Sequence, residues 1–299
     1  MSAAKRQWKY RPRLPIEYLP YRSLPVSLIA QQMYCEKQVD LWLDNPTSSR
    51  VSVPGGIEEV ETAKVHEERG RADERVELGE DFHLTVERSA AGIEPAELQR
   101  RLRRDETLIL LEYSLQGNYK GLPLIGCADA LRCKGRRVSR IIDYKVTNTP
   151  RLFPSHQAQL RLYGYLLEQA GYDITDLTLV CVFIPSSQQE WIARLSPANT
   201  ERFLNRVWSA ADKIITRKPI DKFSAYGQVL VKRGIKVTLG VFPYKEEKVI
   251  EELDFAVSYW LGKRAPIPTK QAGKCARCLY NAIDRCTDAL VPFSGTNCE

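Results

Sequence analysis

The sequence predicts an α/β fold, and two patterns within its 299 residues carry that prediction. Three runs typical of β-strands, at 108–115, 122–133 and 138–146, are separated by short glycine-containing segments, which favours an antiparallel meander. Farther along, an amphipathic helix at 155–169 precedes the almost continuously apolar run 177–184, which has the pattern of a buried strand. Hydrophobic residues make up 43% and charged residues 27%, the balance of a folded globular chain.

The N-terminal third begins with an arm and continues with helices. Residues 1–25 are basic and rich in proline, which predicts an irregular arm. Ser27 is the candidate N-cap of the first helix, and Cys35 lies in the middle of that helix. His66 lies on the second, charged helix. The spacing of apolar and charged residues predicts these helices at about 27–45, 58–77 and 94–105.

The rest of the chain is predicted to contain both strands and helices. The turns of the meander are expected at Gln116-Gly117-Asn118 and at Lys134-Gly135-Arg136. After the apolar run we expect a paired strand at 190–194, a helix at 199–216, strand-like pieces at 228–230 and 236–242, and a last helix at 248–261.

The charge balance permits an anionic partner. Lys and Arg total 44 against 37 Asp and Glu, a net charge of +7. Basic clusters at 100–104, at 134–140 and in the arm each resemble an ordinary solvated face, but together they could track a phosphate backbone. No apolar stretch approaches the roughly 20 residues of a membrane span, and the N-terminus lacks the apolar region of a secretory signal. We therefore expect a cytoplasmic protein with no membrane partner.

The densest chemistry lies in Ile141-Ile142-Asp143-Tyr144-Lys145. Side chains two apart in a strand share a face, so Asp143 and Lys145 should lie side by side while Tyr144 points away. Asp129, on the preceding strand, supplies a second carboxylate. Two carboxylates on one face are the hard oxygen ligands that Mg²⁺ or Mn²⁺ prefers, and a neighbouring lysine can stabilise developing negative charge. The three groups form a minimal site for metal-assisted phosphodiester hydrolysis.

The alternative is that Asp143 and Lys145 are a solvated pair on an edge strand. The two isoleucines argue against it, because they predict a buried strand in which unpaired charge is costly. Gln159 and Tyr163 lie four residues apart on the following helix and so share one of its faces. Glu112, on the first strand, is a subsidiary acid candidate.

A second constellation lies near the C-terminus. Cys275, Cys278 and Cys286 follow the spacing C-x₂-C-x₇-C, which suits a soft metal centre, either zinc or an iron–sulfur cluster. Cys35 is the candidate fourth ligand, and joining it to Cys275 would close a loop of about 240 residues, at about 5 kcal/mol of entropy in the unfolded chain. Such a centre would be a structural staple. The remaining cysteines within apolar runs are expected to be small buried hydrophobes: Cys127, Cys133 and Cys181.

These motifs, in this order, resemble the RecB-like branch of the PD-(D/E)xK nuclease superfamily. The resemblance implies a nuclease core with a central mixed β-sheet flanked by helices. It implies metal binding by His66, Asp129 and Asp143, with the Tyr144 carbonyl as a further ligand. It also implies that Lys145 is the catalytic lysine, and that Gln159 and Tyr163 position the site or the DNA.

With the cysteines included, the chain resembles the iron–sulfur exonucleases: the CRISPR-associated family Cas-four and its relative exonuclease V. This resemblance implies a [4Fe–4S] cluster on Cys35, Cys275, Cys278 and Cys286, in a cap made from both chain ends. The last gap is seven residues here and five in those families, so Cys298 is the alternative to Cys286. The implied domains are an arm at 1–25, a helical segment at 26–60, a nuclease core at 61–262 and a cysteine-rich segment at 263–299.

The activity implied is a Mg²⁺- or Mn²⁺-dependent DNA exonuclease that prefers single-stranded ends. Its implied role is to process spacer precursors in CRISPR adaptation, an antiviral defence, beside the integrase proteins. Alternatives are a housekeeping or mobile-element repair exonuclease, a non-catalytic DNA-binding scaffold, and a zinc-binding structural module. The polarity of digestion and the oligomeric state, a homo-oligomer included, stay open.

Overall fold

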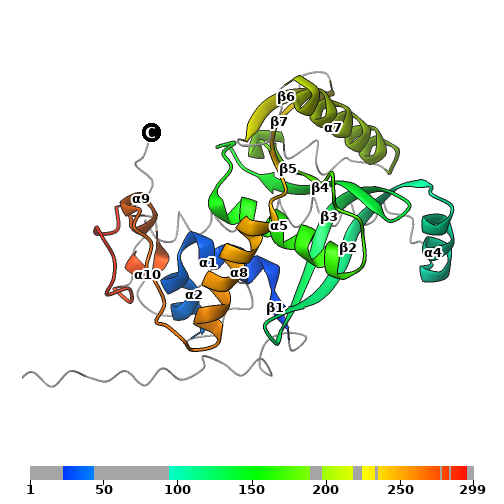
Figure 1. The fold of residues 1–299 in the computed structure, drawn as a ribbon. Helices are drawn as coiled ribbons and strands as arrows, with labels where there is room; N and C mark the ends of the chain where they lie inside the picture. Colours follow the sequence, from blue (N-terminus) through cyan, green and yellow to red (C-terminus); the bar gives the residue numbers. More distant parts are fainter. Residues whose placement is uncertain are drawn as a thin grey trace, which may run out of the picture.

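A seven-stranded mixed sheet organises the computed structural model (Figure 1). The structure describes residues 23–43, 94–188, 197–217, 224–232, 235–276, 278–282 and 284–294. The strands are β1 (Leu24–Pro25), β2 (Thr107–Tyr119), β3 (Leu122–Lys134), β4 (Arg137–Val146), β5 (Thr178–Ile184), β6 (Ala225–Lys232) and β7 (Ile235–Pro243). Their order is β1-β3-β4-β5-β7-β6, with β2 also paired to β3. The predicted α/β architecture with a mixed central sheet is therefore confirmed.

The connection between β4 and β5 decides where the centre of the sheet lies. β2, β3 and β4 form the expected antiparallel meander, but β4 and β5 are parallel. Parallel neighbours need a crossover, which is provided by helix α5 (Pro154–Gln169). All seven residues of β5 are buried, as the apolar run predicted. The β4 strand consequently lies inside the sheet, between β3 and β5.

Helices cover both faces of this sheet. On one face α5 packs with α1 (Val26–Tyr34) and α8 (Glu246–Trp260), and on the other lies α7 (Pro197–Arg217). The buried residues accordingly form two clusters, one around Leu131, Ile141 and Leu179 and one around Ile142 and Val180. The remaining helices of the described residues are α2 (Glu36–Leu43), α4 (Pro95–Arg103), α9 (Ala272–Cys275), α10 (Leu279–Ala282) and the short 3₁₀ helix η3 (Ser186–Gln188).

The first turn of the meander is not at the predicted position. The β2 strand continues through Gly117, and the chain reverses at Lys120 and Gly121, whose φ values of 50° and 85° suit a tight hairpin turn. Gly117 has a different reason to be glycine. A Cβ there would lie 2.6 Å from Leu166 Cδ2 and closer still to Gln169 Oε1, so these two side chains of helix α5 would have to shift to admit a larger residue.

The predicted helix at 27–45 is two helices, and Cys35 is not in the middle of one. Cys35 has extended backbone angles (φ −162°, ψ 108°) and separates α1 from α2. The predicted N-cap was also wrong, since the cap position is Pro25 and no side chain caps the helix. Cys35 thus lies between the two helices, although its backbone N–H still donates to the Gln31 carbonyl at 3.0 Å. The expected helix at 58–77 and the strand at 190–194 lie outside the described residues, as does most of the N-terminal arm.

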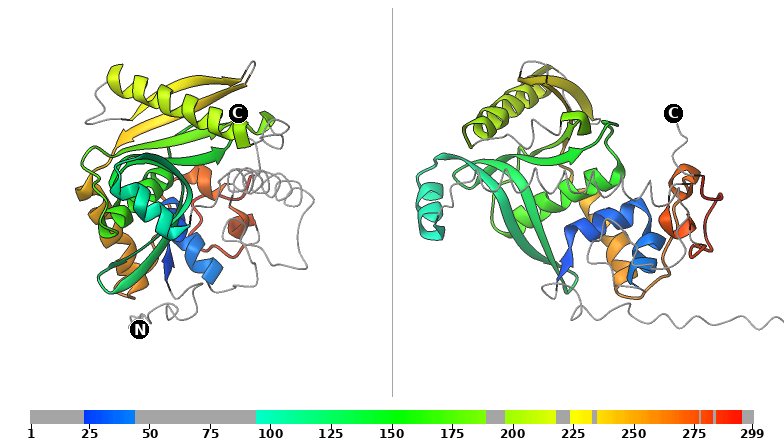
Figure 2. Two further views of the ribbon diagram at one scale, coloured as in Figure 1. Left: turned by 90° about the vertical axis from the view of Figure 1, so that its right-hand side faces the viewer. Right: turned by 180° about the vertical axis from the view of Figure 1, so that it is seen from behind.

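The two ends of the described chain pack against each other (Figure 2). Trp260 Nε1 donates to Gln32 Oε1 at 2.9 Å, and the Tyr259 hydroxyl donates to Asp40 Oδ1 at 3.0 Å. The Glu36 carboxylate, 1% exposed, accepts from both terminal nitrogens of Arg264 and from the backbone N–H of Ile267. Helices α1 and α2 are thereby joined to α8 and the segment after it. No helix within the described ranges is long and apolar enough to cross a membrane.

Candidate active site

The candidate active site is a row of side chains across the middle of the sheet. β3 pairs with β4 through Ala130↔Ile142, so Asp129 lies next to Asp143 in the adjoining strand. Asp129 Oδ2 accepts the backbone N–H of Tyr144 at 2.6 Å. Asp129 is 5% exposed and Asp143 0%, so neither carboxylate is solvated. The sequence therefore predicted the neighbourhood of the two carboxylates correctly, and the alternative of a solvated pair on an edge strand does not hold.

Lys145 joins this row from the same face. Its Nζ lies 3.0 Å from Asp143 Oδ1 and 2.9 Å from Asp143 Oδ2. Burial alone would lower the pKa of Lys145, but the Asp143 and Asp129 carboxylates raise it above its usual value. The lysine is therefore cationic at neutral pH. Tyr144 points the opposite way, into the cluster that α7 covers, as strand geometry requires.

Helix α5 supplies the next two side chains. Gln159 Oε1 accepts from Lys145 Nζ at 3.1 Å, and Gln159 Nε2 donates to the Tyr163 hydroxyl at 2.8 Å. The pKa of Tyr163 is raised, first by burial and then by Asp129 and Asp143, so the phenol stays protonated. The chain Asp143–Lys145–Gln159–Tyr163 holds the lysine in one position. The shared helical face predicted for Gln159 and Tyr163 is thus observed.

Glu112 extends the row on the other side. The register of β2 with β3 brings it opposite Asp129, and Cys127 Sγ lies 3.5 Å from Glu112 Oε2. Glu112 has φ 45°, a left-handed conformation that is costly for a residue with a side chain. The alternation of side chains along β2 shifts by one residue at Glu112. Leu110 and Leu115 show this shift, since they are five residues apart and would face opposite sides of a regular strand, yet both are buried in the same core cluster. Glu112, Asp129 and Asp143 thus lie on three adjacent strands.

Two further findings differ from the sequence analysis. Cys127 is exposed, not a buried hydrophobe, because it lies beside Glu112 at the edge of the site, whereas Cys133 and Cys181 are buried as expected. His156, at the start of α5, was not identified as a site residue. Its ring packs near Phe183, and burial followed by the charge of Lys145 lowers its pKa to about 4. Its place in the first turn of the helix that carries Gln159 was the only signal.

The expected metal ligands are partly within the described structure. His66 and Cys298 lie outside the described residues. Within the described ranges, no three His, Cys, Asp or Glu side chains are arranged to hold a metal ion. The donor chemistry nevertheless fits a divalent cation. Asp143 Oδ2 is buried and accepts no hydrogen bond, although the charged Lys145 Nζ lies 2.9 Å away. The buried carboxylate of Asp129 lies on the adjoining strand, so two hard oxygen ligands are available to a cation.

The four cysteines of the second constellation line one small cavity of about 20 Å³. They are free thiols at the junction of the two chain ends: Cys35, Cys275, Cys278 and Cys286. Burial, and then the neighbouring thiols, raise the pKa values of Cys278 and Cys286. Lys274 Nζ donates to the Tyr34 carbonyl at 2.8 Å, which ties the segment to the end of α1. The thiols are neighbours, although they do not form a ready-made metal site.

Comparison with known proteins identifies the superfamily of this chain. The chain matches the PD-(D/E)XK nuclease superfamily over residues 49–285, and it belongs to that superfamily. No curated protein matches the chain. Among solved structures it is similar to one described as "Crystal structure of SSO0001", at 12% identity over 90% of this chain and 87% of the other, with a TM-score of 0.37.

Proposed function

We propose that this nuclease is a Mg²⁺- or Mn²⁺-dependent DNA exonuclease acting at single-stranded ends. The observation that carries the catalytic part is the buried contact of Lys145 Nζ with the Asp143 carboxylate, beside Asp129 on the next strand. A buried charge cluster of this kind is costly for folding alone, which favours a role in chemistry.

The roles proposed for the residues follow from their contacts. Asp129, Asp143 and the Tyr144 carbonyl would hold the cation, with His66 as a further ligand. When bound, the cation supplies an activated water and neutralises phosphate charge. Lys145 is kept cationic and is held by Gln159, so it would stabilise the negative charge that develops on the attacked phosphate. Tyr163 remains a neutral hydroxyl that orients Gln159.

The preference for DNA ends and the biological role rest on the resemblance to the iron–sulfur exonucleases. We infer a role in preparing spacer precursors for CRISPR adaptation with integrase proteins, and a repair exonuclease is the alternative. Genes encoding integrase proteins next to this one would support the first, and their absence would support the second.

The same resemblance leads us to propose that the four-cysteine cavity binds a [4Fe–4S] cluster. Support comes from four soft ligands around one cavity, drawn from segments about 240 residues apart. Because the cavity is small, the thiols would have to separate as they lose their protons. Nothing in phosphodiester hydrolysis requires a redox change, so the cluster would be structural.

The catalytic assignment is tested with Lys145→Ala. We expect the hydrolysis of end-labelled single-stranded DNA in Mn²⁺ or Mg²⁺ to fall about 10²- to 10³-fold, because a fixed charge at the phosphate is lost. Lys248→Ala, which removes an exposed lysine of α8, is the matched control and should retain activity. Equal rates in both variants would remove the catalytic assignment of Lys145. An unaltered protein that binds DNA without hydrolysing it would be a non-catalytic DNA-binding scaffold. A covalently closed single-stranded circle should resist the enzyme, and its cleavage would contradict exonuclease specificity.

The cluster is tested by anaerobic purification with a visible spectrum and metal analysis. A brown protein with about four irons per chain is expected. Cys286→Ser should bleach it, whereas Cys298→Ser should not, and Cys133→Ser serves as a control because that thiol is buried in the core away from the cavity. A colourless protein with one zinc per chain would contradict the cluster and would identify the cysteine segment as a zinc-binding structural module.

A further inference from the structure

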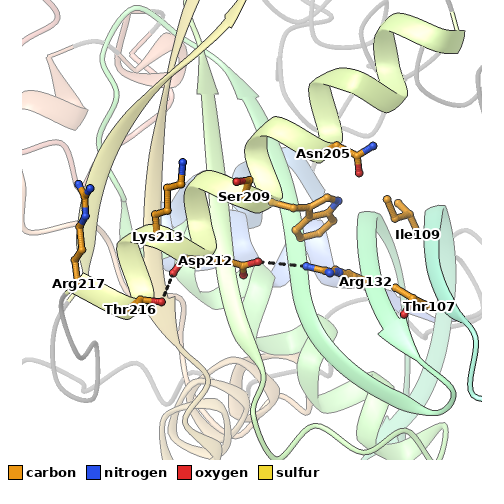
Figure 3. A pocket seen from close by; sticks show the side chains of 10 residues that line it. Thr107, Ile109, Arg132, Asn205, Ser209, Asp212, Lys213, Thr216 and Arg217 are labelled. Carbon is orange, nitrogen blue, oxygen red and sulfur yellow. Dashed lines mark hydrogen bonds and ion pairs between the residues drawn. The ribbon is translucent and has the colours of Figure 1, made fainter.

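A second pocket lies on the α7 face of the sheet, away from α5 and the candidate active site (Figure 3). It has a volume of about 560 Å³, within the range of small-molecule sites. One wall is α7 and the other is formed by side chains of β2 and β3 that include Ile109 and Arg132. Arg132 and Arg140 both contact the Asp212 carboxylate, at 3.3 and 3.0 Å, which fixes the side of the pocket nearest the sheet.

The pocket is cationic at one end. Arg132, Lys213 and Arg217 against Asp212 give three positive charges and one negative, a net charge of +2. Asp212 is already engaged by two arginines. Lys213 and Arg217 form no ion pair with any side chain of the described residues, and Figure 3 shows them at the same end of the helix. This end therefore suits an anion such as a phosphate.

The other end carries hydrogen-bonding groups and an apolar wall. Trp208 is 3% exposed, and its Nε1–H has no acceptor among the described residues. A buried N–H without an acceptor is costly, so an acceptor supplied by a ligand would be favourable. The Asn205 amide, which both donates and accepts, lies one helical turn away, and Ile109 lies across the pocket. This combination suits a heteroaromatic ring with acceptor atoms on its edge.

The two ends are at a suitable separation. Asn205, Ser209 and Lys213 recur every four residues on one face of α7, and the first and last are about 12 Å apart along the helix axis. A ring, a sugar and one phosphate can bridge that span, whereas an inorganic phosphate would leave the tryptophan unpaired.

We propose that this pocket binds a nucleoside monophosphate, with the phosphate at Lys213 and Arg217 and the base at Trp208 and Asn205. The proposal does not depend on the nuclease assignment, because its residues lie on the opposite face of the sheet. Mononucleotide binding can therefore fail while the proposed nuclease function holds, and the nuclease function can fail while mononucleotide binding holds.

The test is a titration of the full-length protein with dAMP and dTMP in EDTA, so that the metal-dependent face contributes nothing. The readout is the Trp208 indole N–H resonance, assigned with Trp208→Phe. We expect saturable binding that shifts this resonance, and Lys213→Ala or Arg217→Ala should weaken binding about five- to tenfold. Arg202→Ala removes an exposed charge of the same helix outside the pocket, and it should change the affinity less than twofold.

Four outcomes would overturn the proposal. They are the absence of saturable binding, equal losses in the Arg202 and Arg217 variants, equally tight binding of inorganic phosphate, and binding of an oligodeoxynucleotide but of neither mononucleotide.

Discussion

The carboxylate–lysine row and the four-cysteine cavity differ in how the chain holds them. Asp129, Asp143 and Lys145 project from adjacent strands in the middle of a sheet. The β4 backbone is paired with β5 at Asp143 and Lys145, and its pairing with β3 ends one residue before Asp143. The cysteines lie at the end of α9, directly before α10, after α10 and at the break before α2. The contacts of Glu36 with Arg264 hold the two chain ends together. Changes in the row should therefore affect chemistry, and changes around the cavity should affect stability.

The largest effect is expected for Asp129→Asn. The amide oxygen can still accept the Tyr144 N–H, so the free energy of unfolding should change by less than about 1 kcal/mol. The loss of one charged ligand should lower the nuclease rate about 10²- to 10³-fold. Paired measurements of rate and urea denaturation test this. A variant that keeps its activity, or one that is inactive only because it unfolds, would contradict the proposal that changes in the carboxylate–lysine row affect chemistry and not stability.

The second effect concerns the joint between the chain ends. Arg264→Ala leaves the buried Glu36 carboxylate without its arginine, which should cost about 3 kcal/mol of unfolding free energy. Lys248→Ala breaks only an exposed pair with Glu251 and should cost less than about 1 kcal/mol. Equal denaturation midpoints for the two variants would show that the joint contributes little.

A third prediction concerns the pH dependence of stability. The folded chain holds His156 with a pKa of about 4, below its ordinary value of 6.5, so the unfolded chain binds a proton more readily. The stability that accompanies the neutral ring is fully present above about pH 6.5 and is lost as the pH falls toward 4. The slope is at most about 1.4 kcal/mol per pH unit. Denaturation of the protein and of His156→Gln at pH 7 and pH 5 should show a smaller decline in the variant, and parallel declines would contradict this.

The smallest effect is expected at Glu112. Its φ of 45° is permitted for glycine without strain, so Glu112→Gly should raise the unfolding free energy by about 1 kcal/mol while lowering nuclease activity. Gly121→Ala, at φ 85° in the exposed turn after β2, is the opposite control and should destabilise. A Glu112→Gly variant that is less stable would mean that the carboxylate supports the fold.

Much of the fold could be predicted because local patterns agree with the tertiary structure. The strand β5 is buried on both sides and was predicted from its apolar run, and α5 was predicted from its amphipathic pattern. The predictions were wrong where the local structure depends on a contact with an element that is distant in the sequence. Gly117 was mistaken for a turn because the close approach of α5 is not visible in the local sequence.

By itself the sequence determined the alternation that sets Asp143 and Lys145 on one face, because residues two apart in a regular strand project to the same side. It also determined the pairing of Gln159 with Tyr163 through helical spacing. Only the tertiary structure decided that Glu112 lies opposite Asp129, that His156 lies near Lys145, and that the α7 face contains a pocket with an unpaired tryptophan N–H. Those relations depend on strand register and on the packing of a helix about 100 residues farther along the chain, which no short stretch of sequence specifies.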